Sequence, residues 1–280
     1  MGDEAIHRAV SADGTEIVGR VHGQGPPLVL LHGRLDDGDS CWARLLPLLT
    51  DRFTCLTPST RGRGLSGDSP DHAPERLVED VVAFIDSVGE PVRVVGLSSG
   101  AQLSLGALGR SAAASAAAVY EPGVSEVLTE EDGARLRDAM SRMAELAGNG
   151  RLAEAARAFL AVVATDRELA AATAAGYEDT WARYVPIALE ESQQTHLGPS
   201  DAPRPTDPLA LAQISVPVLV LHGSDTPPRW ITDGVRHVAA HVPAVRVREI
   251  AGAGHLAPIV EPELVADELI RFFHATPDPA

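Results

Sequence analysis

The chain has 280 residues, of which 45% are apolar, and carries a formal net charge of −16 at pH 7. This length and apolar content fit a single α/β domain with an inserted cap better than two independent domains. The negative charge argues against partners such as nucleic acid or an anionic membrane surface, because both attract clustered cations. No apolar run approaches the roughly 18 residues of a membrane span, and the N-terminus lacks a basic, apolar signal sequence, so we expect a cytoplasmic protein.

The first part of the chain alternates β-like and helical segments. Residues 5–10 and 15–21 predict an antiparallel hairpin, because the turn signal Ala12-Asp13-Gly14 separates them. Further strands are expected at 28–31, 53–57, 92–96 and 116–120, with helices at 41–49, 74–88 and 99–109. This alternation predicts an α/β fold with a mostly parallel sheet and helices on both faces. Ligands of such sheets bind beyond the carboxyl ends of the strands.

Residues 123–208 lack a β signal and carry apolar side chains at helical spacing, as in Leu136, Met140 and Met143. We interpret this segment as a helical cap inserted into an α/β core that comprises 1–122 and 209–280. The apolar cap residues are expected mainly to pack the cap helices against each other. The core pattern resumes with strands at 216–223 and 245–250 and helices at 230–241 and 262–274.

The segment 92–101 is the most informative part of the sequence. Its apolar, β-branched run breaks into Gly96-Leu97-Ser98-Ser99-Gly100 and continues as a helical pattern. A serine on such a strand-to-helix turn is pushed out of the sheet, and flanking glycines leave room because they have no Cβ. Ser98 is therefore the candidate nucleophile.

Two further motifs accompany this turn. Leu31-His32-Gly33-Arg34 ends a buried strand, and Gly252-Ala253-Gly254-His255 lies between a strand and a final helix. With the Gly-x-Ser-x-Gly turn, these motifs resemble the α/β-hydrolase superfamily over nearly the whole chain. The resemblance implies that His255 is the general base. It also implies an oxyanion hole made by the backbone N–H of Ser99 and that of Gly33 or Arg34.

The acid that orients His255 is ambiguous in the sequence. The superfamily's usual position after the strand ending at Gly223 holds Thr226, and Asp225 lies one residue early. The alternative is Glu121, which follows the strand after the nucleophile and precedes Pro-Gly. A glutamate at the mouth of an apolar strand has little structural reason to occur, so we favour Glu121 over Asp225.

Short motifs also resemble the fungal zearalenone lactone hydrolases: Ser98 to Ala101, the position of Glu121, Thr226-Pro227, and Trp181-Ala182-Arg183. Those enzymes carry their acid after the strand that follows the nucleophile and use a cap tryptophan to contact the lactone. By that resemblance Trp181 becomes a substrate-binding candidate, with Tyr184 beside it. Packing within the cap is the alternative for Trp181.

One further loop resembles a turn of the superfamily, and its expected role is structural and not catalytic. Arg61-Gly62-Arg63-Gly64-Leu65-Ser66 matches the superfamily's Arg-Gly-x-Gly-x-Ser turn, but Ser59 stands where an acidic residue usually precedes the arginine. The substitution leaves open which carboxylate, if any, pairs with Arg61.

The sequence thus predicts a serine hydrolase, without cofactor or metal, that cleaves a hydrophobic small-molecule ester or lactone through an acyl-enzyme. The alternatives on the same fold are a lyase, a perhydrolase, a cofactor-free oxygenase, or a ligand receptor with residual hydrolysis. Cys41 and Cys55 are expected to be reduced structural thiols. The sequence does not specify the oligomeric state, and a homodimer is one of the possibilities.

Overall fold

A computed structural model describes residues 5–197 and 204–276 and contains an eight-stranded sheet in the order β1-β2-β4-β3-β5-β6-β7-β8. The strands are β1 (Ile6–Val10), β2 (Glu16–Gly23), β3 (Pro27–Leu31), β4 (Thr54–Pro58), β5 (Val92–Leu97), β6 (Ala114–Tyr120), β7 (Val218–Gly223) and β8 (Val245–Ile250). The first two strands are antiparallel to their neighbours, and all pairs from β4 to β8 are parallel. The predicted α/β fold with a mostly parallel sheet is confirmed.

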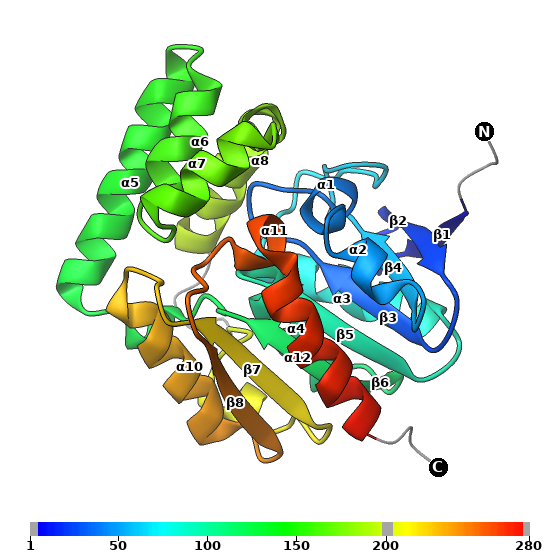
Figure 1. The fold of residues 1–280 in the computed structure, drawn as a ribbon. Helices are drawn as coiled ribbons and strands as arrows, with labels where there is room; N and C mark the ends of the chain where they lie inside the picture. Colours follow the sequence, from blue (N-terminus) through cyan, green and yellow to red (C-terminus); the bar gives the residue numbers. More distant parts are fainter. Residues whose placement is uncertain (1–4, 198–203, 277–280) are drawn as a thin grey trace.

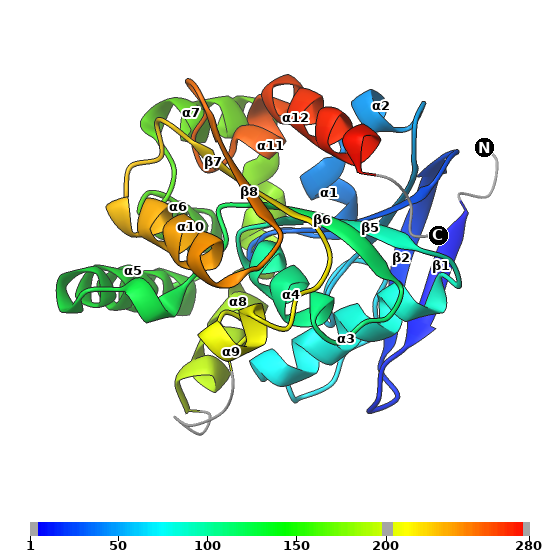
Figure 2. The same cartoon turned by 90° about the horizontal axis from the view of Figure 1, so that it is seen from below.

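Helices cover both faces of this sheet (Figure 2). One face carries α1 (Gly38–Trp42), α2 (Leu46–Leu49), α11 (Ala257–Val260) and α12 (Pro262–Ala275). The other carries α3 (Pro74–Ser87), α4 (Ser99–Leu108), α9 (Pro208–Leu211) and α10 (Arg229–His241). Successive strand residues alternate between the two cores: Leu28 and Leu30 belong to the first, Val29 and Leu31 to the second. Because both faces are buried, the strands are continuous apolar runs.

Four consecutive helices between β6 and β7 in the chain gather beyond one end of the sheet, in green to yellow-green in Figure 1. They are α5 (Glu130–Gly148), α6 (Leu152–Leu160), α7 (Asp166–Ala174) and α8 (Tyr177–Leu197). We refer to these four helices as the cap. Part of the predicted cap segment, 198–203, lies outside the described residues. The cap shares one apolar cluster with the core, since Met143 and Trp181 pack in the same cluster as Leu35 and Leu256.

Two local details differ from or extend the sequence analysis. The single helix expected at 41–49 is two short helices, α1 and α2, and α2 carries Pro47 in its first turn. Proline has no N–H to donate to the preceding turn, which favours a new helix start there. Cys41 and Cys55 are free and buried, and burial raises the pKa of both thiols, that of Cys55 to about 12. Both thiols are therefore protonated at neutral pH.

Candidate active site

The carboxyl ends of four neighbouring parallel strands bring the sequence-predicted residues to one edge of the sheet. Ser98 follows β5, Glu121 follows β6, Gly223 ends β7, and His255 lies in the loop after β8. Backbone hydrogen bonds continue the ladder into this region: Ser98 N donates to Tyr120 O at 2.9 Å, and Glu121 N donates to Leu221 O at 2.9 Å. The sheet thus fixes the start of each functional loop relative to its neighbour.

Ser98 has the backbone conformation of a strained turn, with φ 56° and ψ −114°, at the start of α4. This left-handed conformation is unfavourable for a residue with a side chain and persists only where the surrounding structure enforces it. The flanking glycines explain how. A Cβ at Gly96 would lie 2.5 Å from Ser104 Oγ, and one at Gly100 would lie 2.3 Å from Leu31 O. The Gly-x-Ser-x-Gly pattern therefore allows β5, β3 and α4 to approach closely around a half-buried Ser98.

Glu121 is the carboxylate that contacts His255. Its Oε2 lies 2.6 Å from His255 Nδ1, and its side chain is fully buried. Its Oε1 accepts hydrogen bonds from Gly223 N at 2.8 Å and from the Thr226 hydroxyl at 2.5 Å. These contacts supply hydrogen-bond partners to both oxygens of the buried carboxylate without an arginine. Nδ1 of His255 is thereby occupied, which leaves Nε2 as the free nitrogen of the ring.

Asp225, the alternative acid, lies elsewhere. Its side chain is 47% exposed, accepts from the Ser224 hydroxyl at 2.8 Å, and lies 3.9 Å from the Arg167 guanidinium. Thr226 occupies the superfamily's usual acid position and donates to Glu121 instead. The sequence showed this threonine but gave no sign that it supports the acid on the neighbouring strand.

The loop after β3 is held in place through His32. Its Nε2 accepts from Thr60 N at 3.0 Å, and its Nδ1 lies 2.8 Å from Gly33 O. Burial lowers the pKa of His32 to about 4, so the ring is neutral at pH 7 and can accept and donate in this arrangement. The guanidinium of Arg34 donates to Ser192 on α8 at 3.1 Å. The Arg34 side chain is thus engaged with α8. The backbone of Gly33 and Arg34 is the part of this loop that remains available at the carboxyl ends of the strands.

The hydroxyl of Ser98 and the imidazole of His255 are not hydrogen-bonded to each other in the part of the chain that the structure describes.

The same described residues contain no group of three or more His, Cys, Asp or Glu side chains arranged to hold a metal ion. Within that same part, no helix is both long and apolar enough to cross a bilayer.

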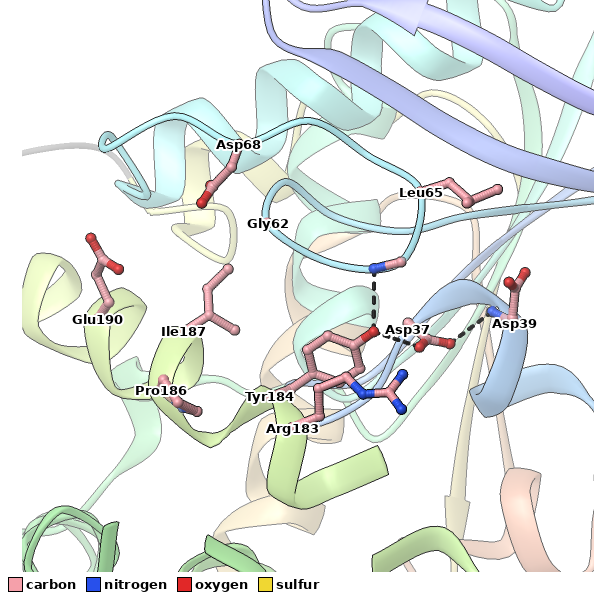
Figure 3. A pocket seen from close by; sticks show the side chains of 11 residues that line it. Asp37, Asp39, Gly62, Leu65, Asp68, Arg183, Tyr184, Pro186, Ile187 and Glu190 are labelled. Atoms are coloured by element: carbon pink, nitrogen blue, oxygen red, sulfur yellow. Dashed lines mark hydrogen bonds between the residues drawn. The ribbon is translucent and has the colours of Figure 1, made fainter. Parts of the chain in front are cut away.

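The two cap aromatics that the sequence singled out differ in their surroundings. Trp181 is buried in the cluster shared by cap and core, with its ring centroid 5.9 Å from that of Tyr177. Tyr184 donates its hydroxyl to Asp37 at 2.6 Å and accepts from Gly64 N at 3.2 Å. It lines a cavity of about 610 Å³ that neither Ser98 nor His255 lines (Figure 3). The Tyr184 hydroxyl thus contacts the loops that follow β3 and β4.

Buried ion pairs were missed by the sequence analysis because their partners are far apart in the chain. Arg61 pairs with Asp80, at 2.6 and 2.7 Å, and with Asp13 at 2.9 Å. These two aspartates supply the charge that Ser59 does not. Arg63 forms a two-pronged pair with Glu191 on α8, which ties the cap to the core.

The chain belongs to the alpha/beta hydrolase family, whose profile matches residues 28–268. An alpha/beta hydrolase from Sphaerobacter thermophilus has 29% identity and a TM-score of 0.74, and the match covers 95% of this chain and all of that one. The enol-lactonase from Burkholderia xenovorans has the same fold, with 22% identity, a TM-score of 0.73, and coverage of 96% and 100%.

Two curated relatives are also similar in sequence. A Mycobacterium tuberculosis protein provisionally named a non-heme bromoperoxidase is 28% identical over 279 residues, which cover 90% of this chain and 95% of the relative. A pyrrolizixenacetamide deacetylase from Xenorhabdus hominickii is 33% identical over 75 residues, and this chain spans only 27% of its length.

Proposed function

We propose that this protein is a serine hydrolase that cleaves a carboxylic ester or lactone of a hydrophobic small molecule. The observation that supports the proposal is the buried His255–Glu121 pair, together with the strained backbone of Ser98 at the end of the strand next to the one that Glu121 follows. Membership of the alpha/beta hydrolase family supports it, and so does a shared fold with an enol-lactonase.

Each candidate catalytic residue has its own role in the proposed reaction. His255 Nε2 takes the proton from Ser98 Oγ as the oxygen attacks the carbonyl, while Glu121 holds the Nδ1 proton and stabilises the imidazolium. The backbone N–H of Ser99 and that of Gly33 or Arg34 donate to the oxyanion. Imidazolium then protonates the leaving oxygen, and water, activated by His255, hydrolyses the acyl-serine. Hydrogen bonds between nucleophile and base are commonly long before substrate binds, and shorten in the complex.

The apolar residues of the cap support the proposal of an apolar substrate. Trp181 and Tyr177 belong to the apolar cluster that continues from the cap into the core. Of the two cap candidates, Trp181 fits a substrate contact better, because the Tyr184 hydroxyl is already bonded to Asp37 and Gly64. The cap would then supply the apolar wall opposite the oxyanion hole.

A fluorophosphonate probe tests the nucleophile. This reagent phosphonylates a serine only when a base activates it, so we expect labelling of the wild-type protein and none of Ser98→Ala. Asp225→Asn serves as the matched control and should be labelled at the wild-type rate. Equal labelling of Ser98→Ala and the wild type, or hydrolysis of aryl esters by Ser98→Ala at the wild-type rate, would falsify the assignment.

A perhydrolase is the second candidate, and the relative named for bromoperoxidase activity favours it. In that reaction hydrogen peroxide replaces water as the attacking group. The acyl–Ser98 bond breaks, a peroxy acid leaves, and the serine regains its proton. Bromination of a chromogenic acceptor in acetate, bromide and peroxide would reveal this activity. Loss of bromination in Ser98→Ala would show that it proceeds through the same acyl-enzyme.

A further inference from the structure

Helix α7 of the cap touches the loop that carries His255 at three places. Glu168 Oε1 accepts from Leu256 N at 2.8 Å, directly after the histidine. The Arg167 guanidinium donates to Gly252 O at 2.7 Å. A Cβ at Gly254 would lie 2.2 Å from Glu168 Oε2, so the loop backbone passes directly against this carboxylate. No other cap helix makes a hydrogen bond to residues 252–256 in the described chain.

The core also holds this loop. The Tyr120 hydroxyl, at the end of β6, donates to Gly254 O at 2.6 Å. The two peptide units that flank His255 are therefore each bonded, one to the core through Tyr120 and the other to the cap through Glu168. This matters because Gly252, at φ 75°, and Gly254 make the loop intrinsically flexible.

Glu168 is itself fixed. It is 1% exposed, and its Oε2 accepts from Thr165 N and from the Thr165 hydroxyl, both at 3.0 Å. Thr165 Oγ1 in turn accepts from Glu168 N, which completes a capping box at the start of α7. Three donors and the positive end of the helix dipole allow this carboxylate to stay buried. A capping box at a helix N-terminus is usually exposed to solvent, so its burial against the His255 loop calls for a reason.

We propose that Glu168 is a positioning residue for the general base. The carboxylate fixes the backbone of the His255 loop relative to Glu121, so that the imidazole lies where it can meet both the acid and Ser98. A catalytic group must be held within roughly 0.5 Å of its productive position, and small displacements lower the rate strongly. The inference rests on the proposed hydrolase function and adds that the cap helps to align the base, in addition to covering the substrate.

Three single variants test this role. Glu168→Ala leaves Leu256 N without its acceptor, and we expect kcat for an aryl ester to fall roughly 10- to 100-fold, with KM changed less than about threefold. Glu168→Gln keeps an acceptor oxygen for Leu256 N, while its NH2 replaces the acceptor of Thr165 N, so it should lower Tm but keep kcat within about threefold of the wild-type value. Thr165→Val is the matched control, because it weakens the capping box and lowers Tm but leaves the bond to the loop.

Hydrogen exchange supplies a readout that does not depend on turnover. The amide of Leu256 should exchange faster in Glu168→Ala than in Glu168→Gln or Thr165→Val, and peptides from β5 and β6 should be unchanged. If Glu168→Ala does not fold, Gly254→Ala replaces it, since the new methyl group would meet Glu168 Oε2 and displace the loop. We expect this variant to show the same loss of kcat and the same local increase in exchange.

The outcomes separate the two proposals. Wild-type kcat in a folded Glu168→Ala, or an equal loss in Glu168→Ala and Glu168→Gln, would overturn the positioning role while Ser98 still reacts with the fluorophosphonate. Absence of fluorophosphonate labelling in the wild-type protein would instead overturn the hydrolase proposal itself. A loss of kcat in Thr165→Val as large as in Glu168→Ala would show that the stability of α7, and not the Leu256 bond, is what the base requires.

Discussion

A glutamate after β6 and a threonine after β7 together form the support of His255. Glu121 leaves its strand with φ 46°, a conformation that side-chain-bearing residues rarely adopt, and its carboxylate reaches across to the β7 loop. Gly223 N and the Thr226 hydroxyl occupy one oxygen, so the other oxygen is directed at His255. The position of the acid is therefore set by two adjacent strands.

This arrangement predicts that substitution of Glu121 lowers kcat strongly and that substitution of Asp225 hardly changes it. Glu121→Gln would present an amide to His255 Nδ1 and favour the wrong tautomer, so we expect kcat for an aryl ester to fall roughly 10³- to 10⁴-fold. Asp225→Asn, on the exposed side of the loop, should stay within about twofold of the wild type. Steady-state kinetics of the two purified variants decides the matter, and a reversed pattern would assign the acid to Asp225.

Asp36 makes the stability of the folded chain depend on pH. Burial raises the pKa of its carboxyl to about 7, from an ordinary value of 3.8, despite hydrogen bonds from the Ser40 hydroxyl and Asp37 N that lower it. Between these two pH values the folded chain keeps a proton that the unfolded chain has released. The contribution of Asp36 to stability is therefore complete below pH 3.8 and is lost as the pH rises through 7.

Asp36→Asn tests this sign. The amide keeps an acceptor oxygen for Asp37 N and Ser40 but cannot ionise. From pH 5.5 to pH 8, the free energy of unfolding of the variant should rise relative to the wild type by about 2 kcal/mol. Urea unfolding at the two pH values measures the difference. A difference that stays constant with pH would show that Asp36 does not titrate in this range.

The sequence allowed the strand-to-helix turn at Ser98 and the loop at His255 to be located, because each is encoded by residues that are close together in the chain. The Gly-x-Ser-x-Gly turn and the Gly-x-Gly-His loop can each be recognised from a few consecutive residues. Thr226, Glu168 and Glu191 were missed because their partners are distant in sequence: Glu168 and Leu256 are separated by 88 positions, and Arg63 and Glu191 by 128. No local pattern distinguishes such a carboxylate from the many exposed ones on a helix surface.

At the scale of elements, α8 is joined to the core by a buried charge network. Arg63 donates to both oxygens of Glu191, at 2.5 and 3.0 Å, and also to Arg34 O at 2.9 Å. Burial raises the pKa of Glu191, but the neighbouring Arg63 and Arg34 guanidinium groups and His72 together hold it below its ordinary value. The cap helix is thus linked through Arg63 to the backbone of the predicted oxyanion loop.

Removing one partner should cost far more than removing both. Glu191→Leu leaves the Arg63 charge buried and unpaired, and we expect the free energy of unfolding to fall by about 3–5 kcal/mol. The double variant Arg63→Leu/Glu191→Leu should lose less than the sum of the two single losses. Urea denaturation of the four proteins gives the coupling energy. Additive losses would mean that the pair contributes nothing specific to docking of α8.

For the molecule as a whole, the sequence predicted the α/β fold because a sheet covered on both faces produces unmistakable apolar strands. The arrangement of the cap helices was not predictable in the same way, since an amphipathic helix does not specify which surface its apolar side will meet. The structure shows one answer: cap residues such as Met143 and Trp181 pack in the same cluster as Trp42 and Leu256 of the core.

This shared cluster predicts that cap and core unfold together. Phenylalanine substitutions that leave only Trp181, or only Trp42, provide a fluorescent reporter in the cap or in the core. Both reporters should give the same urea midpoint, and far-UV circular dichroism should coincide with them. An earlier transition at Trp181 than at Trp42 would show that the cap is a separate unit of stability.

The two buried thiols have a practical consequence. Cys41 and Cys55 are protonated and inaccessible in the folded protein, and the chain contains no other cysteine. A cysteine introduced at an exposed site such as Leu209 would therefore be the single position open to a maleimide dye or a nitroxide. Spectroscopic labels can thus be attached one at a time with both native sulfurs left in place.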